Sequence, residues 1–457
     1  MSSEKTVTEQ FVTPAPDDIV SFSVVVQPRA GVPIEEIRTH LTLDTLHEYE
    51  ASESRLARVK HQLRRRGFEV FNLQSPVVSA RGRVDRFQEV FGGKLLKWVR
   101  TTTTVKSTRV VSAIVLDPEA PRPSPEQIEG AALIAVAPPP RFVVPAIPDL
   151  KGSELRLPGD VAQLTGASAT HRLTTPGGER ATGSGVRVAV IDSGFAQHPY
   201  FDQHGYNITR LAAPDSDSPE VDDEPHGTAV IAALLACAPD VEALGIKVGD
   251  NYVLALDFAM ACPNLSVISI SWVYDLVDDN GAPLDLVPLD LVPIWMRILD
   301  AISAGVTIVA AAGNGQTAFP AMMPEVLAVG GVAIDPHDDH LEAWDGGSSF
   351  SSAIFQDRNV PDVCAFASDM GLPIPAAEGY WMSDHGTSFA APQVCGIAAL
   401  LLQKNPALGP NDIRTALTIT AVDITRGTTA TGDTAGVGSD RATGAGLVSA
   451  RQAWQFV

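Results

Sequence analysis

Five short apolar runs place the tightest constraint on how this chain folds. They are VRVAVID at 186–192, VEALGIKV at 241–248, SVISISW at 266–272, VTIVAAA at 306–312 and VLAVGGVA at 326–333. Strands that are apolar on both faces are typical of parallel sheets covered by helices on both sides. Helical patterns lie between the runs, for example at 253–260 and 294–304. We therefore expect an α/β domain with a mainly parallel sheet over 181–457.

The residues before this domain have a different pattern. Strand-like and helix-like segments follow the order β-α-β-β-α-β over 21–116, which predicts a smaller α+β domain of the ferredoxin-like type. Its strands are expected at 21–27, 69–73, 77–81 and 94–99, and its helices are expected to start near Ser52 and to cover 84–91.

Three further segments are defined by their composition. Residues 1–20 are expected to be a polar tail. Residues 117–180 are rich in proline and glycine, which indicates a linker and a processing region. The repeated LDLVP at 284–288 and 289–293 has too few copies for a solenoid and is expected to be an inserted surface loop.

The charge of the chain lies in its larger part. Residues 1–150 hold 19 Lys and Arg against 18 Asp and Glu, which leaves 14 of the 33 basic and 36 of the 54 acidic residues for 151–457. An acidic surface argues against binding to a phosphate backbone, so no nucleic-acid partner is expected. No apolar run approaches the roughly 18 residues that a membrane span needs, so no membrane partner is expected either.

The first residues and the cysteines bear on the compartment. MSSEKTVTEQFVTPAPDD has neither the basic nor the apolar region of a secretory signal. The four cysteines are spaced neither as a zinc site nor as a disulfide framework, and their apolar flanks favour small buried thiols. These two features predict a cytoplasmic protein.

Four short motifs carry the residues that could do chemistry. AVIDSG places Asp192 at a strand end, EPHGTAV places His226 at a helix start, AAGN places Asn314 after a strand, and HGTSFAAP places Ser388 at another helix start. Each residue alone is more often a cap or a structural group. Together they supply what acyl transfer needs: a hydroxyl nucleophile, a base, a carboxylate that orients the base, and an oxyanion donor.

In that order, these motifs resemble the signatures of the subtilisin-like serine proteases, peptidase family S8. The separation is 34 residues from Asp192 to His226 and 162 from His226 to Ser388, and the resemblance extends from about 185 to 457. It implies a subtilisin-like three-layer fold and a serine endopeptidase that requires no cofactor. Two alternatives remain: a peptide ligase or macrocyclase of the same fold, and a pseudoprotease that only binds peptides.

The resemblance also implies the role of each site residue. Ser388 would attack the scissile carbonyl, His226 would carry the proton, Asp192 would orient the imidazole, and Asn314 would donate to the oxyanion. The peptide substrate would add as a strand along Ser271, Trp272 and Val273, with its specificity pocket walled by Ala311, Ala312 and Gly313. Val273 departs from the family, which usually has glycine there, and would narrow the non-prime pockets.

Three features beside these motifs have competing interpretations. The acidic stretch before His226 could bind Ca²⁺, could favour basic substrate residues, or could be a solvated loop, and its spacing fits no defined calcium site. It contains Asp215, Asp217, Glu220, Asp222, Asp223 and Glu224. No metal ligand is therefore assigned. His198 and His385 are expected to have structural or peripheral roles.

The N-terminal domain has a resemblance of its own. The stretch from 64 to 96 resembles the activation domain of the sedolisin, or kumamolisin-type, proteases. This implies a zymogen whose N-terminal domain binds and inhibits the catalytic domain until the chain is cut within 117–180. The near-neutral first domain, with Arg64, Arg65 and Arg66, suits docking on an acidic partner.

Overall fold

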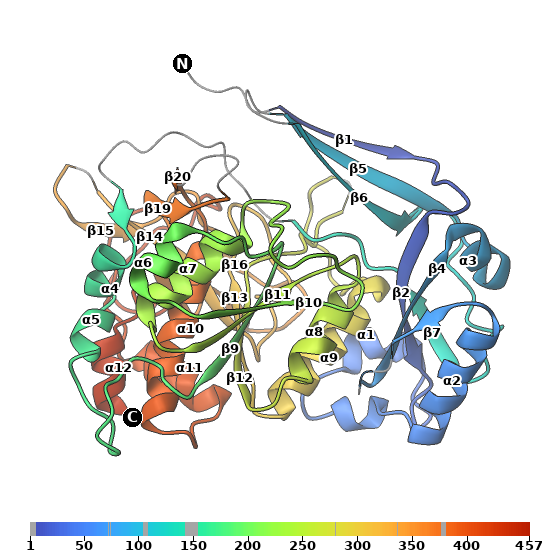
Figure 1. The fold of residues 1–457 in the computed structure, drawn as a ribbon, viewed down its shortest axis with the longest axis horizontal. Helices are drawn as coiled ribbons and strands as arrows, with labels where there is room; N and C mark the ends of the chain where they lie inside the picture. Colours follow the sequence, from blue (N-terminus) through green and yellow to red (C-terminus); the bar gives the residue numbers. More distant parts are fainter. Residues whose placement is uncertain are drawn as a thin grey trace.

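The computed structural model describes residues 6–71, 73, 75–103, 108–141, 154–278, 280–335, 337–375 and 381–457. It divides into a large C-terminal part built on one sheet and a smaller N-terminal part that packs against it (Figure 1).

The large part contains the predicted parallel sheet. Its strands lie in the order β10-β11-β9-β12-β13-β14, all parallel to their neighbours; β18 also pairs in parallel with β14, and β15 is antiparallel to it. The bounds are β9 Arg187–Asp192, β10 Ile208–Ala212, β11 Glu242–Lys247, β12 Leu265–Ile270, β13 Thr307–Ala311, β14 Leu327–Ile334, β15 Leu341–Ala343 and β18 Val363–Phe366.

Helices cover both faces of this sheet, so the three-layer α/β prediction is confirmed (Figure 1). Successive side chains of β9 point to opposite faces: Val188 and Val190 pack in one core with α7 and α10, whereas Ala189 and Ile191 pack in a second core with α8 and α9. These helices are α7 Gly227–Cys237, α8 Tyr252–Met260, α9 Val292–Ser303 and α10 Thr387–Lys404.

Shorter elements complete the large part. The helices are α4 Gly159–Leu164, α5 Ala167–Thr170, α6 Pro199–His204, α11 Pro410–Ile419 and α12 Ala450–Phe456, with the 3₁₀ turn η3 Leu289–Leu291. The strands are β8 Leu155–Arg156, β16 Phe350–Ser351, β17 Asn359–Val360, β19 Met370–Pro373 and β20 Trp381–Asp384. None of the helices in the described ranges has the length and apolar character needed to cross a membrane.

The N-terminal part holds an antiparallel sheet with the order β3-β4-β2-β7. Its elements are β2 Ile19–Val26, α2 Glu53–Arg65, β3 Glu69–Val70, β4 Val77–Arg83, α3 Val84–Phe91 and β7 Ala131–Ala135, with α1 Ile37–His40 and the turns η1 Ile34–Glu36 and η2 Leu46–Tyr49 between β2 and α2. The side chain of Ser52 caps α2, close to where the helix was expected to start. Phe22 packs edge to face on Phe68 and on Phe87 and Phe91 of α3, and Phe68 stacks on Phe91.

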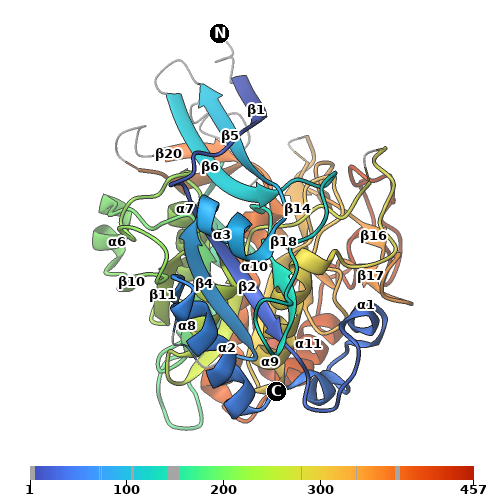
Figure 2. The same ribbon diagram turned by 90° about the vertical axis from the view of Figure 1, so that its right-hand side faces the viewer.

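The predicted segment order is present, but its last strand is not where we expected it. The fourth strand of this sheet is β7, which lies inside the supposed linker 117–180. The expected strand 94–99 instead belongs to β5 Leu95–Thr103, which pairs with β1 Thr6–Val12 and β6 Thr108–Leu116 in a separate sheet that extends from the body (Figures 1 and 2). Residues 6–12 are therefore a paired strand rather than a tail, because the extended β5 offers their polar, β-branched sequence a partner edge.

The N-terminal part and the large part share one hydrophobic core. Apolar side chains of β2, β4 and β7 pack with those of α8 and α9, while α2 and α3 cover the other face of the small sheet (Figure 2). The side chains on the shared side are Val25, Val77, Leu133 and Ala135.

Polar contacts from the LDLVP repeat reinforce this interface. Arg122 makes a two-pronged ion pair with Asp290, at 2.8 and 2.7 Å. Asp290 Oδ1 also accepts the backbone N–H of Val136 at 3.1 Å, and Arg38 Nε donates to the carbonyl of Val287 at 2.7 Å. The repeat was expected to be a surface loop; in the structure it contacts the N-terminal part.

Candidate active site

Asp192 and His226 form a buried pair at the carboxyl end of the main sheet. Asp192 is the last residue of β9, and His226 directly precedes α7. The two side chains are almost fully buried, and His226 Nδ1 lies 2.8 Å from Asp192 Oδ1. Because a carboxylate can only accept, the imidazole carries a proton on Nδ1, which leaves Nε2 as its basic nitrogen.

Neighbouring carboxylates tune this imidazole. Burial would lower the pKa of His226, but the charge and hydrogen bond of Asp192, with the charges of Asp222 and Asp384, outweigh burial and raise the pKa above its usual value. The protonated form that a general base passes through is therefore stabilised in this site.

Ser388 lies in the first turn of α10, beside His226. The ring of Phe389, the next residue, is centred 5.8 Å from the His226 ring. Ser388 Oγ donates to the backbone carbonyl of Ser271 at 3.1 Å, and Ser271 Oγ donates back to the carbonyl of Ser388 at 2.8 Å. This reciprocal pair joins the start of α10 to the segment that follows β12.

Asn314 is held next to the same turn by Thr387. Asn314 Oδ1 accepts the backbone N–H of Thr387 at 2.9 Å and lies 2.9 Å from Thr387 Oγ1, which also accepts the N–H of Gly313 at 3.1 Å. With its oxygen engaged, the amide directs Nδ2 elsewhere, and a Cβ placed on Gly386 would lie 3.4 Å from this nitrogen. The Nδ2 group thus lies beside Gly386, two residues before Ser388.

The expected substrate-binding residues that follow β12 are all buried. Ser271 is 2% and Val273 4% exposed, and the Trp272 indole is fully buried, where its Nε1 donates to the carbonyl of Ile191 at 3.1 Å. The part of this segment that pairs with another chain segment is its backbone, at Val273. Ala311, Ala312 and Gly313 are buried at and after the end of β13, and their expected place in a specificity pocket stays a prediction.

The edge at Val273 is already paired in this structure. Arg141 and Val273 exchange both backbone hydrogen bonds as an antiparallel bridge, N–H of Arg141 to O of Val273 at 2.9 Å and the reverse at 3.3 Å. Residues 142–153, the core of the expected processing region, lie outside the described residues. The described chain resumes at Glu154, and the next residue, Leu155, pairs with Met370 of β19.

The acidic stretch before His226 is tied to a buried lysine. Buried Lys247 binds Asp217 at 2.5 Å, Asp223 at 2.7 Å and the carbonyl of Val221 at 2.8 Å. Burial raises the pKa of Asp215 to about 6. In the described part of the chain, no group of three or more His, Cys, Asp or Glu side chains is arranged to hold a metal ion.

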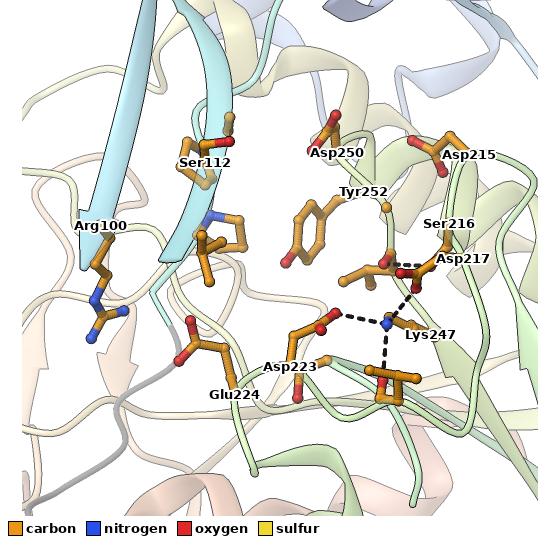
Figure 3. Close-up of a pocket in the computed structure, with 18 of the residues that line it drawn as sticks. Arg100, Ser112, Asp215, Ser216, Asp217, Asp223, Glu224, Lys247, Asp250 and Tyr252 are labelled. Atoms are coloured by element: carbon orange, nitrogen blue, oxygen red, sulfur yellow. Dashed lines mark hydrogen bonds and ion pairs between the residues drawn. The ribbon is translucent and has the colours of Figure 1, made fainter. Parts of the chain in front are cut away.

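A cavity of about 660 Å³ separates this acidic stretch from the β5–β6 hairpin. Figure 3 shows Arg100 of β5 and Ser112 of β6 on one side, and Asp217 and Asp223 around Lys247 on the other. Arg109 of β6 reaches across it, where its guanidinium donates to the carbonyl of Asp223 at 3.1 Å. The hairpin of the N-terminal part thus faces the loop that leads to His226.

Sequence reasoning missed several residues near the pair. Ser193 and Asp222 bond to the Asp192–His226 unit, and Asp384 lowers the electrostatic cost of charging His226. The only signal in the sequence was their position: Ser193 directly follows Asp192, Asp222 lies four residues before His226, and Asp384 lies four residues before Ser388. The expected structural roles of two histidines agree with their contacts: His198 caps α6, and His385 accepts the N–H of Asp369.

Comparison with known proteins gives a consistent result. The model of the "Subtilase family" matches residues 183–446. The chain is 30% identical over 279 residues to Subtilisin Savinase of Lederbergia lenta, which covers 60% of this chain and 91% of that protein. It is 30% identical to M-protease of Shouchella clausii (60% of this chain, 65% of that protein) and 32% identical to Subtilisin E of Bacillus subtilis (52% and 61%). The match thus spans less than two thirds of the length of M-protease and Subtilisin E.

Proposed function

Because the chain belongs to the subtilase family, we propose that it is a serine endopeptidase that cleaves peptide bonds through an acyl-enzyme on Ser388. The observation that carries the proposal is the buried Asp192–His226 pair beside the turn that bears Ser388. The chemistry is that of a nucleophile, a base and a group that orients the base.

Each side chain has a defined step in this proposal. Ser388 Oγ turns from the Ser271 carbonyl, gives its proton to His226 Nε2 and bonds to the scissile carbon. The C–N bond then breaks, and the same proton passes from Nε2 to the leaving amine. Water then gives a proton to His226 Nε2 and attacks the acyl carbon, and the bond to Ser388 Oγ breaks as Oγ takes that proton back. Asp192 holds the Nδ1-protonated tautomer throughout.

The negative oxygen of each tetrahedral intermediate needs preorganised donors. Asn314 Nδ2 is one, since Thr387 fixes the orientation of the amide. The backbone N–H of Ser388, at the start of α10, is the second, and the helix dipole favours negative charge there.

We further propose that the N-terminal part acts as an inhibitor of the unprocessed chain. Arg141 is bonded to Val273 as an added strand would be, on the edge where a peptide substrate is expected. Leu155 is already paired within the large part. The cut that separates the two parts is therefore expected after Arg141 and before Leu155, a narrower interval than 117–180.

Mass measurement of the purified wild-type chain and of Ser388→Ala tests both proposals. Wild type is expected to give two fragments with an end between Arg141 and Leu155, while Ser388→Ala stays at 48.3 kDa. A fluorophosphonate should label the wild type on Ser388 and should not label Ser388→Ala. A wild type that is not labelled would refute the proposal that the protein is a serine protease. Products joined to an added amine would indicate a ligase. An intact wild type that hydrolyses peptides at full rate would refute inhibition by the N-terminal part.

A further inference from the structure

A second buried carboxylate, Asp222, lies beside the Asp192–His226 pair. Asp222 Oδ1 accepts the backbone N–H of His226 at 3.2 Å, and Oδ2 accepts the backbone N–H and the hydroxyl of Thr228 at 2.9 and 2.6 Å. The residue as a whole is 7% exposed. These bonds satisfy donors at the start of α7, the helix that begins directly after His226.

Ser193 joins the two carboxylates to each other. Its hydroxyl lies 2.6 Å from Asp222 Oδ1 and 3.1 Å from Asp192 Oδ1, and it accepts the N–H of Gly227 at 3.2 Å. One hydroxyl proton thus serves two carboxylates, with the shorter contact to Asp222. Ser193, which follows Asp192, is thus hydrogen-bonded to Gly227, which follows His226.

The charge state of Asp222 follows from its partners. Burial raises the pKa of Asp222 above its usual value, and hydrogen bonds from Ser193 and Thr228 oppose this. The two backbone N–H groups can only donate, so Asp222 must offer acceptors to them, as an ionised carboxylate does.

We propose that Asp222 is a positioning residue for His226. It fixes the main chain on both sides of the imidazole and adds a negative charge that supports the protonated ring. The proposal rests on the proposed function, since it assigns a role within that reaction. The titratable groups that face His226 are Asp192 from β9, Asp222 from the loop before α7 and Asp384 from the end of β20.

The structure separates this role from that of an ordinary helix cap. A cap that only stabilises α7 would change the unfolding temperature and nothing else. A positioning residue also controls the base, so its loss should lower kcat with little change in KM and should lower the pKa of His226. The lower pKa follows because removing a negative neighbour makes the charged imidazole less favourable.

The test compares Asp222→Asn with Asp217→Asn in the full chain. Asp217 is a matched control: it lies in the same acidic stretch, its side chain is 72% exposed, and it is ion-paired to Lys247 rather than to the pair. For Asp222→Asn we expect kcat to fall between about 10- and 100-fold, the effect of a small displacement of a catalytic group. The acid limb of kcat/KM should move to lower pH, and Asp222→Glu should restore part of kcat.

A second measurement does not depend on turnover. The imidazole of His226 is titrated by NMR in Ser388→Ala and in Ser388→Ala with Asp222→Asn, with melting curves of both. A lower His226 pKa in the double variant supports the proposal, whereas an unchanged pKa with only a lower melting temperature overturns it. If wild type itself proves inactive, the proposed function fails while this titration still decides the role of Asp222.

Discussion

The ion pair between Arg122 and Asp290 offers a quantitative test of how the N-terminal part is held. Arg122 is 39% and Asp290 17% exposed in their side chains, so the pair itself should contribute only about 0.5 kcal/mol after solvent screening. Asp290 also accepts the N–H of Val136, which is 2% exposed. Leaving that donor unsatisfied costs about 1 kcal/mol or more.

Asp290→Ala should therefore weaken the non-covalent binding of the processed N-terminal part by about 1.5 kcal/mol, which is roughly tenfold in Kd. Arg122→Ala removes the ion pair and a 3.4 Å hydrogen bond to the carbonyl of Ile134, which lies within the N-terminal part, and should raise Kd about two- to threefold. The double variant should match Asp290→Ala, because Arg122 has already lost its partner across the interface.

The assay measures peptidase activity on dilution of the processed complex, since the proposed inhibition predicts that release of the N-terminal part restores activity. Arg58→Ala is the control, because its ion pair with Glu129 lies within the N-terminal part and is largely exposed. If Asp290→Ala stays within twofold of wild type, or if the double variant shows the sum of the single effects, the reasoning from this contact is refuted.

Two other predictions concern the site. Peptidase activity should be lost as the pH falls through the pKa of His226, because the base must be neutral. Since the pKa of His226 is raised, the midpoint of the acid limb of kcat/KM should lie above the usual pKa of a histidine. A midpoint below that pKa would contradict the prediction. Asn314→Ala should lower kcat roughly 10²–10³-fold, a value taken from a subtilisin and hence from the family, with KM little changed; equal kcat in Asn314→Ala and wild type would exclude Asn314 as an oxyanion donor.

The sequence was sufficient for the large part because its signals are local. The apolar runs at 186–192 and 306–312 become β9 and β13, and the motif residues sit at strand and helix ends as their spacing predicts. Parallel sheets bring their carboxyl ends to one edge, which is why Asp192 and His226 meet although 34 residues separate them.

Pairing in the N-terminal part was less accessible from sequence. Segment 94–99 has the pattern of a strand, but a pattern does not say which sheet a strand joins, and the structure pairs it with residues 6–12. β7 was missed because proline-rich segments flank it on both sides. Asp222 was not separated from its five acidic neighbours, for which Ca²⁺ binding, a preference for basic substrates and a solvated loop were all left open, whereas its own side chain is buried. Trp272 was placed at the substrate edge although its indole is in the core.

The core shared by the two parts has a consequence for how the chain reaches its folded state. Val25, Val77 and Leu133 cover the apolar sides of α8 and α9, which begin at Tyr252 and Val292. Domains generally fold as units, with the N-terminal one first during synthesis, so we expect the sheet that covers α8 and α9 to form before either helix is made. The apolar sides of the two helices would then have a folded surface to pack against as soon as they emerge.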